Sequence, residues 1–151
     1  MRRSSVWEAL LARPLVALLA YIAAWTLAAT LTFPSLHHDM LEAWVWGQHP
    51  SLGYFKHPPL SALLPAIWFG VMPRQDWAFY LLAYANAAAG LWAVWLIAGR
   101  LLPERSRSLA VLLLGLTPFF TFSAAKFNAN TVLLSVWPWT VWLLVRSLDR
   151  R

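Results

Sequence analysis

Three observations predict an all-α integral membrane protein. Of its 151 residues, 60% are hydrophobic and only 12% are charged, whereas a soluble domain carries about 25% charged residues. The apolar residues form long runs, several of which approach the ~20 residues that a helix needs to cross a bilayer. Basic residues lie at the ends of those runs, a pattern that sets membrane orientation. The net charge of +6 therefore does not indicate nucleic acid as a partner.

Four apolar segments are the predicted transmembrane helices. The first follows the basic start MRRSS, but it exceeds the ~7–15-residue core of a signal peptide, so we expect an uncleaved helix. In the second, Asn86 and Gly90 lie one turn apart and predict a helix–helix contact. In the fourth, Pro138 predicts a kink. The four segments are residues 14–33, 77–102, 108–122 and 131–148.

The distribution of basic residues predicts the orientation. With four crossings, one side of the membrane holds nine arginines, while the other holds only Lys56, Arg74 and Lys126. The positive-inside rule makes the arginine-rich side cytoplasmic. We therefore expect a multi-pass protein of the inner (plasma) membrane, with both termini in the cytoplasm and the loop of residues 34–76 outside. A full crossing by residues 60–72 would weaken this charge bias, but that segment is short for a span.

The outer loop gathers the polar chemistry. Residues 37–48 and 60–72 predict two interfacial helices, the first capped by Ser35. On the first helix, Glu42 shares a face with Asp39 and with His38. A carboxylate at a partly desolvated boundary can have a raised pKa and act as a general base. A neighbouring lysine or histidine can bind a phosphate.

Other interpretations of these residues stay open on local chemistry alone. Asp39 and Glu42 could form an ordinary solvated helix face. The group His37, His38, Asp39 and Glu42 could bind a divalent metal, with His38, Asp39 and Glu42 as the candidate ligands, although no strict metal motif is present. The chain has no cysteine, which excludes disulfides and thiolate ligands. His57, before two prolines, could belong to a rigid turn.

The order of four motifs adds a resemblance. "HHDMLEAWVWGQ", "LGYFKHPPL" and "LSALLPAIWFGVM" follow one another, and "LTPFFTFSAAKFNANTVLL" comes later. This arrangement resembles the family 39 glycosyltransferases, the protein O-mannosyltransferase-like group that includes the aminoarabinose transferases. The resemblance implies the N-terminal part of a GT-C fold. It also implies transfer of a sugar from a polyprenyl-phosphate carrier to an acceptor on the outer face of the membrane.

The resemblance implies roles for individual residues. Asp39 takes the position of the catalytic aspartate that removes the acceptor proton, and Glu42 would orient the acceptor or assist a metal ion. Lys56 and His57 fall where relatives contact the donor phosphate. The remaining residues expected to bind substrate are Tyr54, in the Gly-Tyr element, and Lys126. Many relatives have an acidic residue where this chain has KFNAN, so a positioning role for Asn128 and Asn130 is a further hypothesis.

Length limits these expectations. Relatives have roughly eleven or more spans, so we expect this chain to be a fragment that is inactive alone and is completed by C-terminal helices of the same enzyme or by a partner subunit. The expected partners are the polyprenyl-phosphate-linked sugar donor and membrane lipid. The alternative is a non-catalytic small membrane protein, a subunit or scaffold that binds lipid phosphate. A small ion transporter is disfavoured because the spans hold few polar residues.

Overall fold

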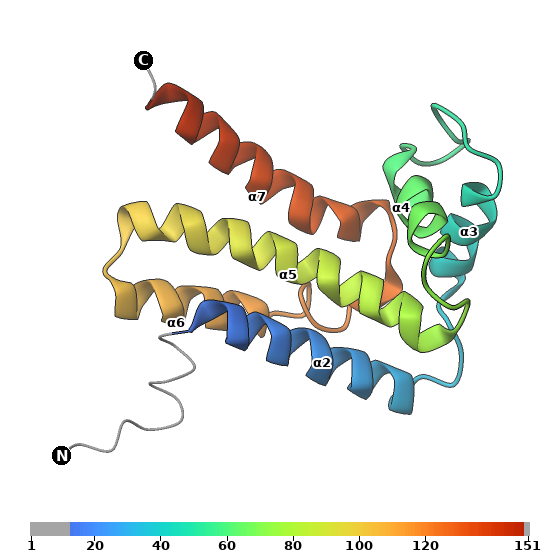
Figure 1. The fold of residues 1–151 in the computed structure, drawn as a ribbon, viewed down its shortest axis with the longest axis horizontal. Helices are drawn as coiled ribbons and strands as arrows, with labels where there is room; N and C mark the ends of the chain where they lie inside the picture. The colour runs from blue at the N-terminus through green and yellow to red at the C-terminus, as the bar shows by residue number, and fades with distance from the viewer. Residues whose placement is uncertain (1–12, 150–151) are drawn as a thin grey trace.

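The structure, a computed structural model, describes residues 13–149 and confirms the all-α class over that range (Figure 1). Three of its helices are long and apolar enough to cross a membrane. Each of the three coincides with a predicted span to within two residues at either end. The elements in order are α2 (Pro14–Thr32), α3 (His38–Gly47), α4 (Leu60–Trp68), α5 (Asp76–Leu101), α6 (Glu104–Gly115), the 3₁₀ turn η1 (Ala124–Lys126) and α7 (Ala129–Leu148).

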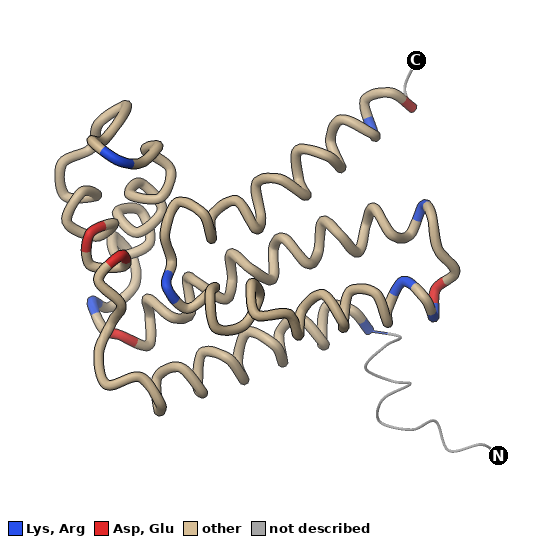
Figure 2. The backbone as a smooth tube through the Cα atoms, turned by 180° about the vertical axis from the view of Figure 1, so that it is seen from behind, with Lys and Arg blue, Asp and Glu red and all other residues tan. Residues whose placement is uncertain are grey.

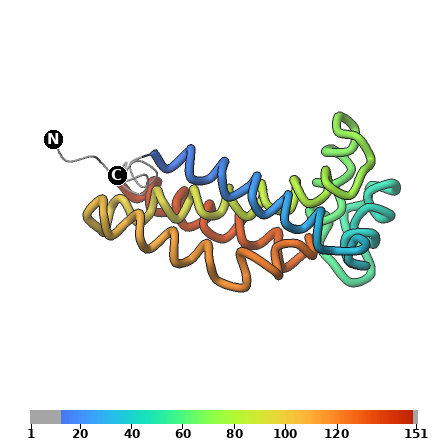
Figure 3. Tube along the Cα trace, turned by 90° about the horizontal axis from the view of Figure 1, so that it is seen from below, coloured from blue at the N-terminus to red at the C-terminus, as the bar shows by residue number. Residues whose placement is uncertain are grey.

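The long helices run side by side, and the two short helices of the outer loop lie together at one end (Figures 1 and 3). Helix α5 is central, because α2, α6 and α7 each pack against it. It supplies about half of the buried apolar side chains, including the fully buried Phe79 and Tyr84. The start of α2 and the last turn of α7 lie at the end opposite to α3 and α4 (Figure 3).

The predicted contact at Asn86 and Gly90 is confirmed as the crossing of α5 and α7. A Cβ atom at Gly90 would overlap the backbone carbonyl of Leu134, so only glycine permits this approach. Asn86 donates from Nδ2 to the carbonyl of Thr131 at 2.8 Å and accepts from the Ser135 hydroxyl at 2.6 Å. Small and polar residues of this kind hold helices together where the hydrophobic effect cannot.

The third predicted span, residues 108–122, is not one helix. Helix α6 begins earlier, at Glu104, and ends at Gly115 after 12 residues, which is too short to cross a ~30 Å hydrocarbon core. Turns and η1 carry the chain onward to α7, whose N-terminal end lies beside α3 and α4 (Figure 1). Pro118 explains the break, because proline has no N–H to donate and clashes with the preceding turn.

Two tyrosines of neighbouring helices make this irregular segment compatible with a membrane. Non-helical backbone at membrane depth is tolerated only where the protein itself satisfies its polar groups. The Tyr21 hydroxyl of α2 donates to the carbonyl of Phe120, and the Tyr84 hydroxyl of α5 donates to the carbonyl of Thr121 at 3.2 Å. Phe120 and Thr121 are themselves buried.

The two short helices fall within the ranges predicted for interfacial helices, with different ends. Helix α3 is capped by His37, not Ser35, because the His37 Nδ1 atom accepts from the Asp39 N–H at 3.3 Å. Helix α4 ends at Trp68 instead of reaching Met72. The helices pack closely because Gly47 has no side chain: a Cβ there would lie 2.6 Å from the Ala62 carbonyl oxygen.

Candidate functional site

Asp39 lies in the first turn of α3, where its carboxylate is held from several directions. The Asn128 amide donates from Nδ2 to Asp39 Oδ2 at 2.8 Å. On the other oxygen, Oδ1, His38 Nε2 lies 2.8 Å away, and His37 Nδ1 lies 3.6 Å from Oδ2. The helix N-terminus also favours a negative charge here. The carboxylate keeps 22% of its surface exposed, so it is accessible as well as oriented.

The pKa of Asp39 is lowered, whereas the sequence allowed for the raised pKa of a desolvated carboxylate. Partial burial does raise the pKa of the Asp39 carboxyl, and it is the largest single influence. The hydrogen bond from Asn128 and the attraction of His37, His38 and Lys126 outweigh it together, so the pKa lies below the usual value. Asp39 is therefore ionised at neutral pH, the state that a general base requires.

Asn128 is placed by the start of α7. Its Oδ1 accepts from the Thr131 N–H at 3.0 Å, and the Thr131 hydroxyl accepts from the Asn128 N–H at 2.7 Å, which is a capping box. The cap uses Oδ1, and this leaves Nδ2 on the opposite side of the amide to donate to Asp39. The preceding Phe127 has a φ of 35°, a left-handed conformation that non-glycine residues rarely adopt. Its ring is completely buried against Phe79, and this burial anchors the strained turn.

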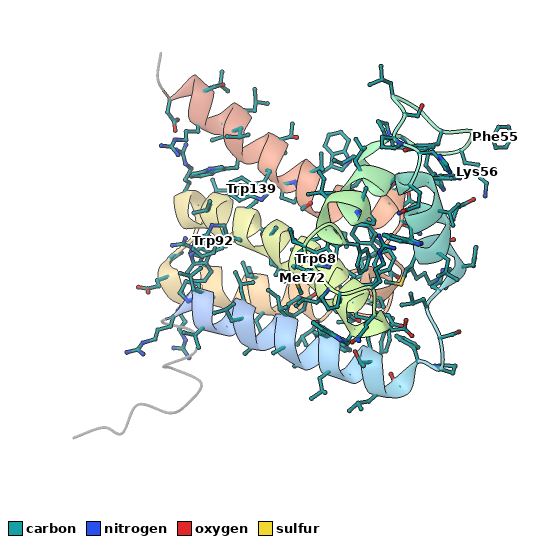
Figure 4. The ribbon with its side chains drawn as sticks, turned by 45° about the vertical axis from the view of Figure 1, so that its right-hand side comes forward. Phe55, Lys56, Trp68, Met72, Trp92 and Trp139 are labelled. Carbon is teal, nitrogen blue, oxygen red and sulfur yellow. The ribbon has the colours of Figure 1, made fainter. Side chains whose placement is uncertain are left out.

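Glu42, on the next turn of α3, forms an ion pair with Lys56 of the loop between α3 and α4. Lys56 Nζ lies 2.8 Å from Glu42 Oε1, with 54% of the lysine side chain exposed. In Figure 4 the Lys56 side chain lies beside α3, while the neighbouring Phe55 projects away from the loop. Phe55 is 97% exposed and Leu52 is 99% exposed. The tip of the loop therefore presents apolar side chains, and the lysine is held at the base of the tip.

His57 and Tyr54 flank Trp46 of α3. The Tyr54 ring stacks on the Trp46 ring with centroids 5.2 Å apart, and the His57 ring contacts Trp46 at 5.5 Å. The Tyr54 hydroxyl lies 3.0 Å from the carbonyl oxygen of Trp46 and 3.1 Å from that of His49, so these two acceptors share its one hydrogen, and the hydroxyl oxygen accepts from the Ser51 N–H. Backbone groups of α3 and the loop therefore use the hydrogen-bonding capacity of this hydroxyl. Tyr54 positions the Lys56–His57 segment in this structure.

A small pocket joins these parts. Residues from α3, from the loop before α4, from α4 itself and from the start of α7 line it: Asp39, Glu42, Ala43, Trp46, His57, Ser61, Asn128 and Ala129. The predicted shared face of Asp39 and Glu42 is confirmed by this lining. Lys126, by contrast, is exposed and is not among the lining residues. Its positive charge lowers the pKa of Asp39. Asn130 is exposed on the first turn of α7 and is not among the lining residues.

The candidate metal ligands are regrouped by the structure. Among residues 13–149, His37, His38 and Asp39 place one ligand atom each within 4.8 Å of one another. Glu42, which the sequence placed in this group, is paired with Lys56 instead. His37 Nδ1 also caps α3, so this ring nitrogen already has a structural use.

The sequence did not indicate Trp46 or Ser61 as contributors to the pocket, and the positioning role hypothesised for Asn128 named no partner residue. The motif Asn128-x-x-Thr131 is a recognisable helix cap. It could have placed the Asn128 side chain at a helix start, but not beside Asp39.

The fold and this site define a membrane-embedded helical bundle with an ionised carboxylate and a lysine–histidine pair at one end. The family model described as dolichyl-phosphate-mannose-protein mannosyltransferase matches residues 56–151. The chain therefore belongs to this glycosyltransferase family, of the GT-C type. The match includes Lys56, His57 and Asn128 and begins after Asp39. No curated protein and no solved structure gives a significant match.

Proposed function

We propose that the pocket around Asp39 transfers a sugar from a polyprenyl-phosphate carrier to a hydroxyl acceptor at the outer surface of the membrane. The observation that carries this proposal is the ionised Asp39, held by Asn128 in one pocket with His57 and Glu42, in a chain of a mannosyltransferase family.

In the proposed reaction the acceptor oxygen attacks the anomeric carbon of the sugar. Its bond to that carbon forms as the bond from the carbon to the phosphate oxygen breaks, and the lipid phosphate leaves with the electron pair. Asp39 accepts the proton of the acceptor hydroxyl. Attack from the face opposite to the leaving phosphate inverts the anomeric centre. Removal of this proton by a positioned base contributes about 10²–10⁴-fold to such rates.

Lys56 and His57 are the proposed contacts of the donor phosphate. A cation at the leaving phosphate stabilises the negative charge that develops there in the transition state. In this structure Glu42 holds the Lys56 ammonium 2.8 Å away. Glu42 therefore orients Lys56 before the donor arrives, and the phosphate would compete for the same N–H donors. Lys126 is proposed as a second, more peripheral phosphate contact.

In the proposed topology the loop of residues 34–76, here called the site loop, lies outside the cytoplasm. Lysine and arginine gather mainly at the end of the bundle opposite to α3 and α4 (Figure 2). Cytoplasmic loops carry the excess of these residues. In the proposed orientation the termini are cytoplasmic, in an inner (plasma) membrane, and α3 lies at the depth of the headgroups where a lipid phosphate is found.

A divalent ion is a separate and optional part of the proposal. The ligands would be His37, His38 and Asp39, which suit a transition metal. An ion there would compete with the His37 cap and with the His38–Asp39 contact. No step of the proposed reaction depends on it, because Asp39 and Lys56 supply the base and the cation.

The test uses the full-length protein in membranes supplied with a polyprenyl-phosphate sugar. Asp39→Asn should abolish transfer and leave donor binding largely intact, whereas Lys56→Ala should chiefly weaken donor binding. Asp76→Asn removes an exposed carboxylate at the same end of the bundle and is the matched control. Transfer at the wild-type rate by Asp39→Asn would refute the catalytic assignment. Donor binding without transfer by the wild-type protein would favour the scaffold alternative.

Orientation has its own test. Ser51 is exposed in the site loop, and the chain has no native cysteine. A Ser51→Cys variant should react with a membrane-impermeant thiol reagent added from the outside. Reaction from the cytoplasmic side alone would overturn the proposed topology.

A further inference from the structure

An apolar groove lies between α2 and α6, near the end of the bundle opposite to the candidate site. Both helices pack on α5, and the groove is the space left between them, with a volume of about 310 Å³. Small side chains leave it open. Its walls include Ala17, Ala20 and Ala24 of α2, Leu112 and Gly115 of α6, and Trp95 of α5.

The length of the groove matches one leaflet of a bilayer. From Pro14 to Ala24, the lining of α2 covers eleven residues, which corresponds to a rise of roughly 15 Å along the helix. The hydrocarbon core of a bilayer is about 30 Å thick. The polar lining side chains, Tyr21 and Ser108, donate their hydroxyl hydrogens to backbone carbonyls of Phe120 and Glu104. The wall is therefore suited to a hydrocarbon chain.

Arginines stand at one end of the groove. Its lining residues Pro14 and Ser108 directly follow Arg13 and Arg107 in the sequence. The Arg107 guanidinium lies over the Trp95 ring, 3.9 Å from its centroid, and donates from Nε to the Trp95 carbonyl at 2.8 Å. Trp95 is itself part of the groove wall, so the cation is held at the groove.

Gly99 allows this placement. A Cβ atom at Gly99 would lie 2.8 Å from Arg107 Cζ, so a larger residue would push the guanidinium off α5. The Nε–H is used by the Trp95 carbonyl, while the terminal nitrogens carry further N–H donors in a planar fork that suits a phosphate. Among residues 13–149, none of the carboxylates forms an ion pair with Arg107.

We infer that this groove binds an anionic phospholipid of the adjacent leaflet, with one acyl chain between α2 and α6 and the headgroup phosphate at Arg107 and Arg13. The occupant is an anionic lipid because an apolar channel of leaflet length ends at Arg107, which Trp95 holds in place, and at the exposed Arg13. The inference does not depend on the proposed sugar transfer, since the groove and the Asp39 pocket share no lining residue.

The first test compares two lipids on the purified chain in a non-ionic detergent. Phosphatidylglycerol should raise the midpoint of thermal unfolding by on the order of 5 °C, and phosphatidylcholine with the same acyl chains should raise it much less. Equal shifts from the two lipids would overturn the inference, because the headgroup charge would then have no role. No shift from either lipid would also overturn it, since the groove would then bind neither lipid.

Paired variants separate the groove from general attraction to an anionic lipid. Arg107→Gln should lose most of the phosphatidylglycerol response, whereas Arg146→Gln, an exposed arginine on α7, should keep it. Ala20→Phe fills the groove and should lose the response, whereas Ala23→Phe, which is also exposed on α2 but outside the lining, should keep it. Full responses from Arg107→Gln and Ala20→Phe would contradict the assignment.

A second measurement avoids any dependence on the stability of the variants. Phosphatidylglycerol with a photoreactive group in its acyl chain should crosslink mainly to residues 14–24 and 108–116 of the wild-type chain. Crosslinks concentrated on α7 would place the lipid elsewhere and overturn the inference.

Discussion

The Asn128 Nδ2 atom donates a 2.8 Å hydrogen bond to Asp39 Oδ2 across 89 positions of sequence. Through the cap at Thr131 and the contacts of Asn86 with Thr131 and Ser135, this bond connects the carboxylate to the crossing of α5 and α7. The orientation of the candidate base therefore depends on how two membrane-spanning helices pack.

Asn128→Asp tests the positioning role of this amide. Aspartate caps a helix about as well as asparagine, so the start of α7 should survive. The new carboxylate would repel that of Asp39 and raise its pKa. In the full-length protein, the acidic limb of the pH profile for sugar transfer should move to higher pH. Asn130→Asp adds the same charge at an exposed position and should leave the limb in place; equal profiles for the two variants would contradict the role.

The lowered pKa of Asp39 predicts a pH dependence of stability. A carboxyl whose folded pKa lies below its unfolded value, about 3.9 for aspartate, stabilises the fold above the unfolded pKa. That contribution is lost as the pH falls through the folded pKa. The melting temperature of Asp39→Asn should therefore be lower than that of the wild type at pH 5 and above, and the gap should narrow below about pH 4. A gap that widens with acid would contradict the shift.

Gly90→Ala tests the crossing of α5 and α7. The added methyl group meets the Leu134 carbonyl, which is backbone and cannot turn aside. Overpacking of this kind costs typically 1–3 kcal/mol, measured as a loss of unfolding free energy in detergent. Gly53 has nothing within 4 Å of a Cβ, and its φ is not positive, so Gly53→Ala should be close to neutral.

Tyr84→Phe tests how the irregular segment after α6 is held in the bundle. The substitution leaves the buried carbonyl of Thr121 without the hydroxyl that donates to it. An unsatisfied buried group costs about 1–3 kcal/mol. Amide hydrogen exchange should accelerate in residues 117–126 and change little in the middle of α7. Uniform acceleration across both segments would indicate general destabilisation instead.

The Lys56–Glu42 ion pair should contribute little to stability. An exposed pair is typically worth about 0–1 kcal/mol, and more than half of the Lys56 side chain is exposed. A double-mutant cycle with Lys56→Ala and Glu42→Gln should give a coupling in stability below about 1 kcal/mol. In the full-length protein, Lys56→Ala should still weaken donor binding at least several-fold. A large coupling with unchanged donor binding would make the pair structural.

The helix positions were largely predictable because they depend on local sequence. The predicted segments 14–33, 77–102 and 131–148 correspond closely to α2, α5 and α7, since an apolar run of about 20 residues cannot be solvated and must be helical in a bilayer. The segment 108–122 was mispredicted as one span. Its apolar composition resembles a span, while Pro118 and the distant hydroxyls of Tyr21 and Tyr84 decide its backbone.

By itself, the sequence determined the membrane class, the loop that carries the candidate residues and the resemblance that the family match confirms. Composition, run length and motif order depend on the order of residues along the chain, so they can be read without knowledge of the fold. Only the tertiary structure decided that Asn128 orients Asp39, that Glu42 holds Lys56 and that Arg107 lies on Trp95. Asn128 and Asp39 belong to different helices, and their distance depends on helix packing and on the turn at Phe127, which no local pattern encodes.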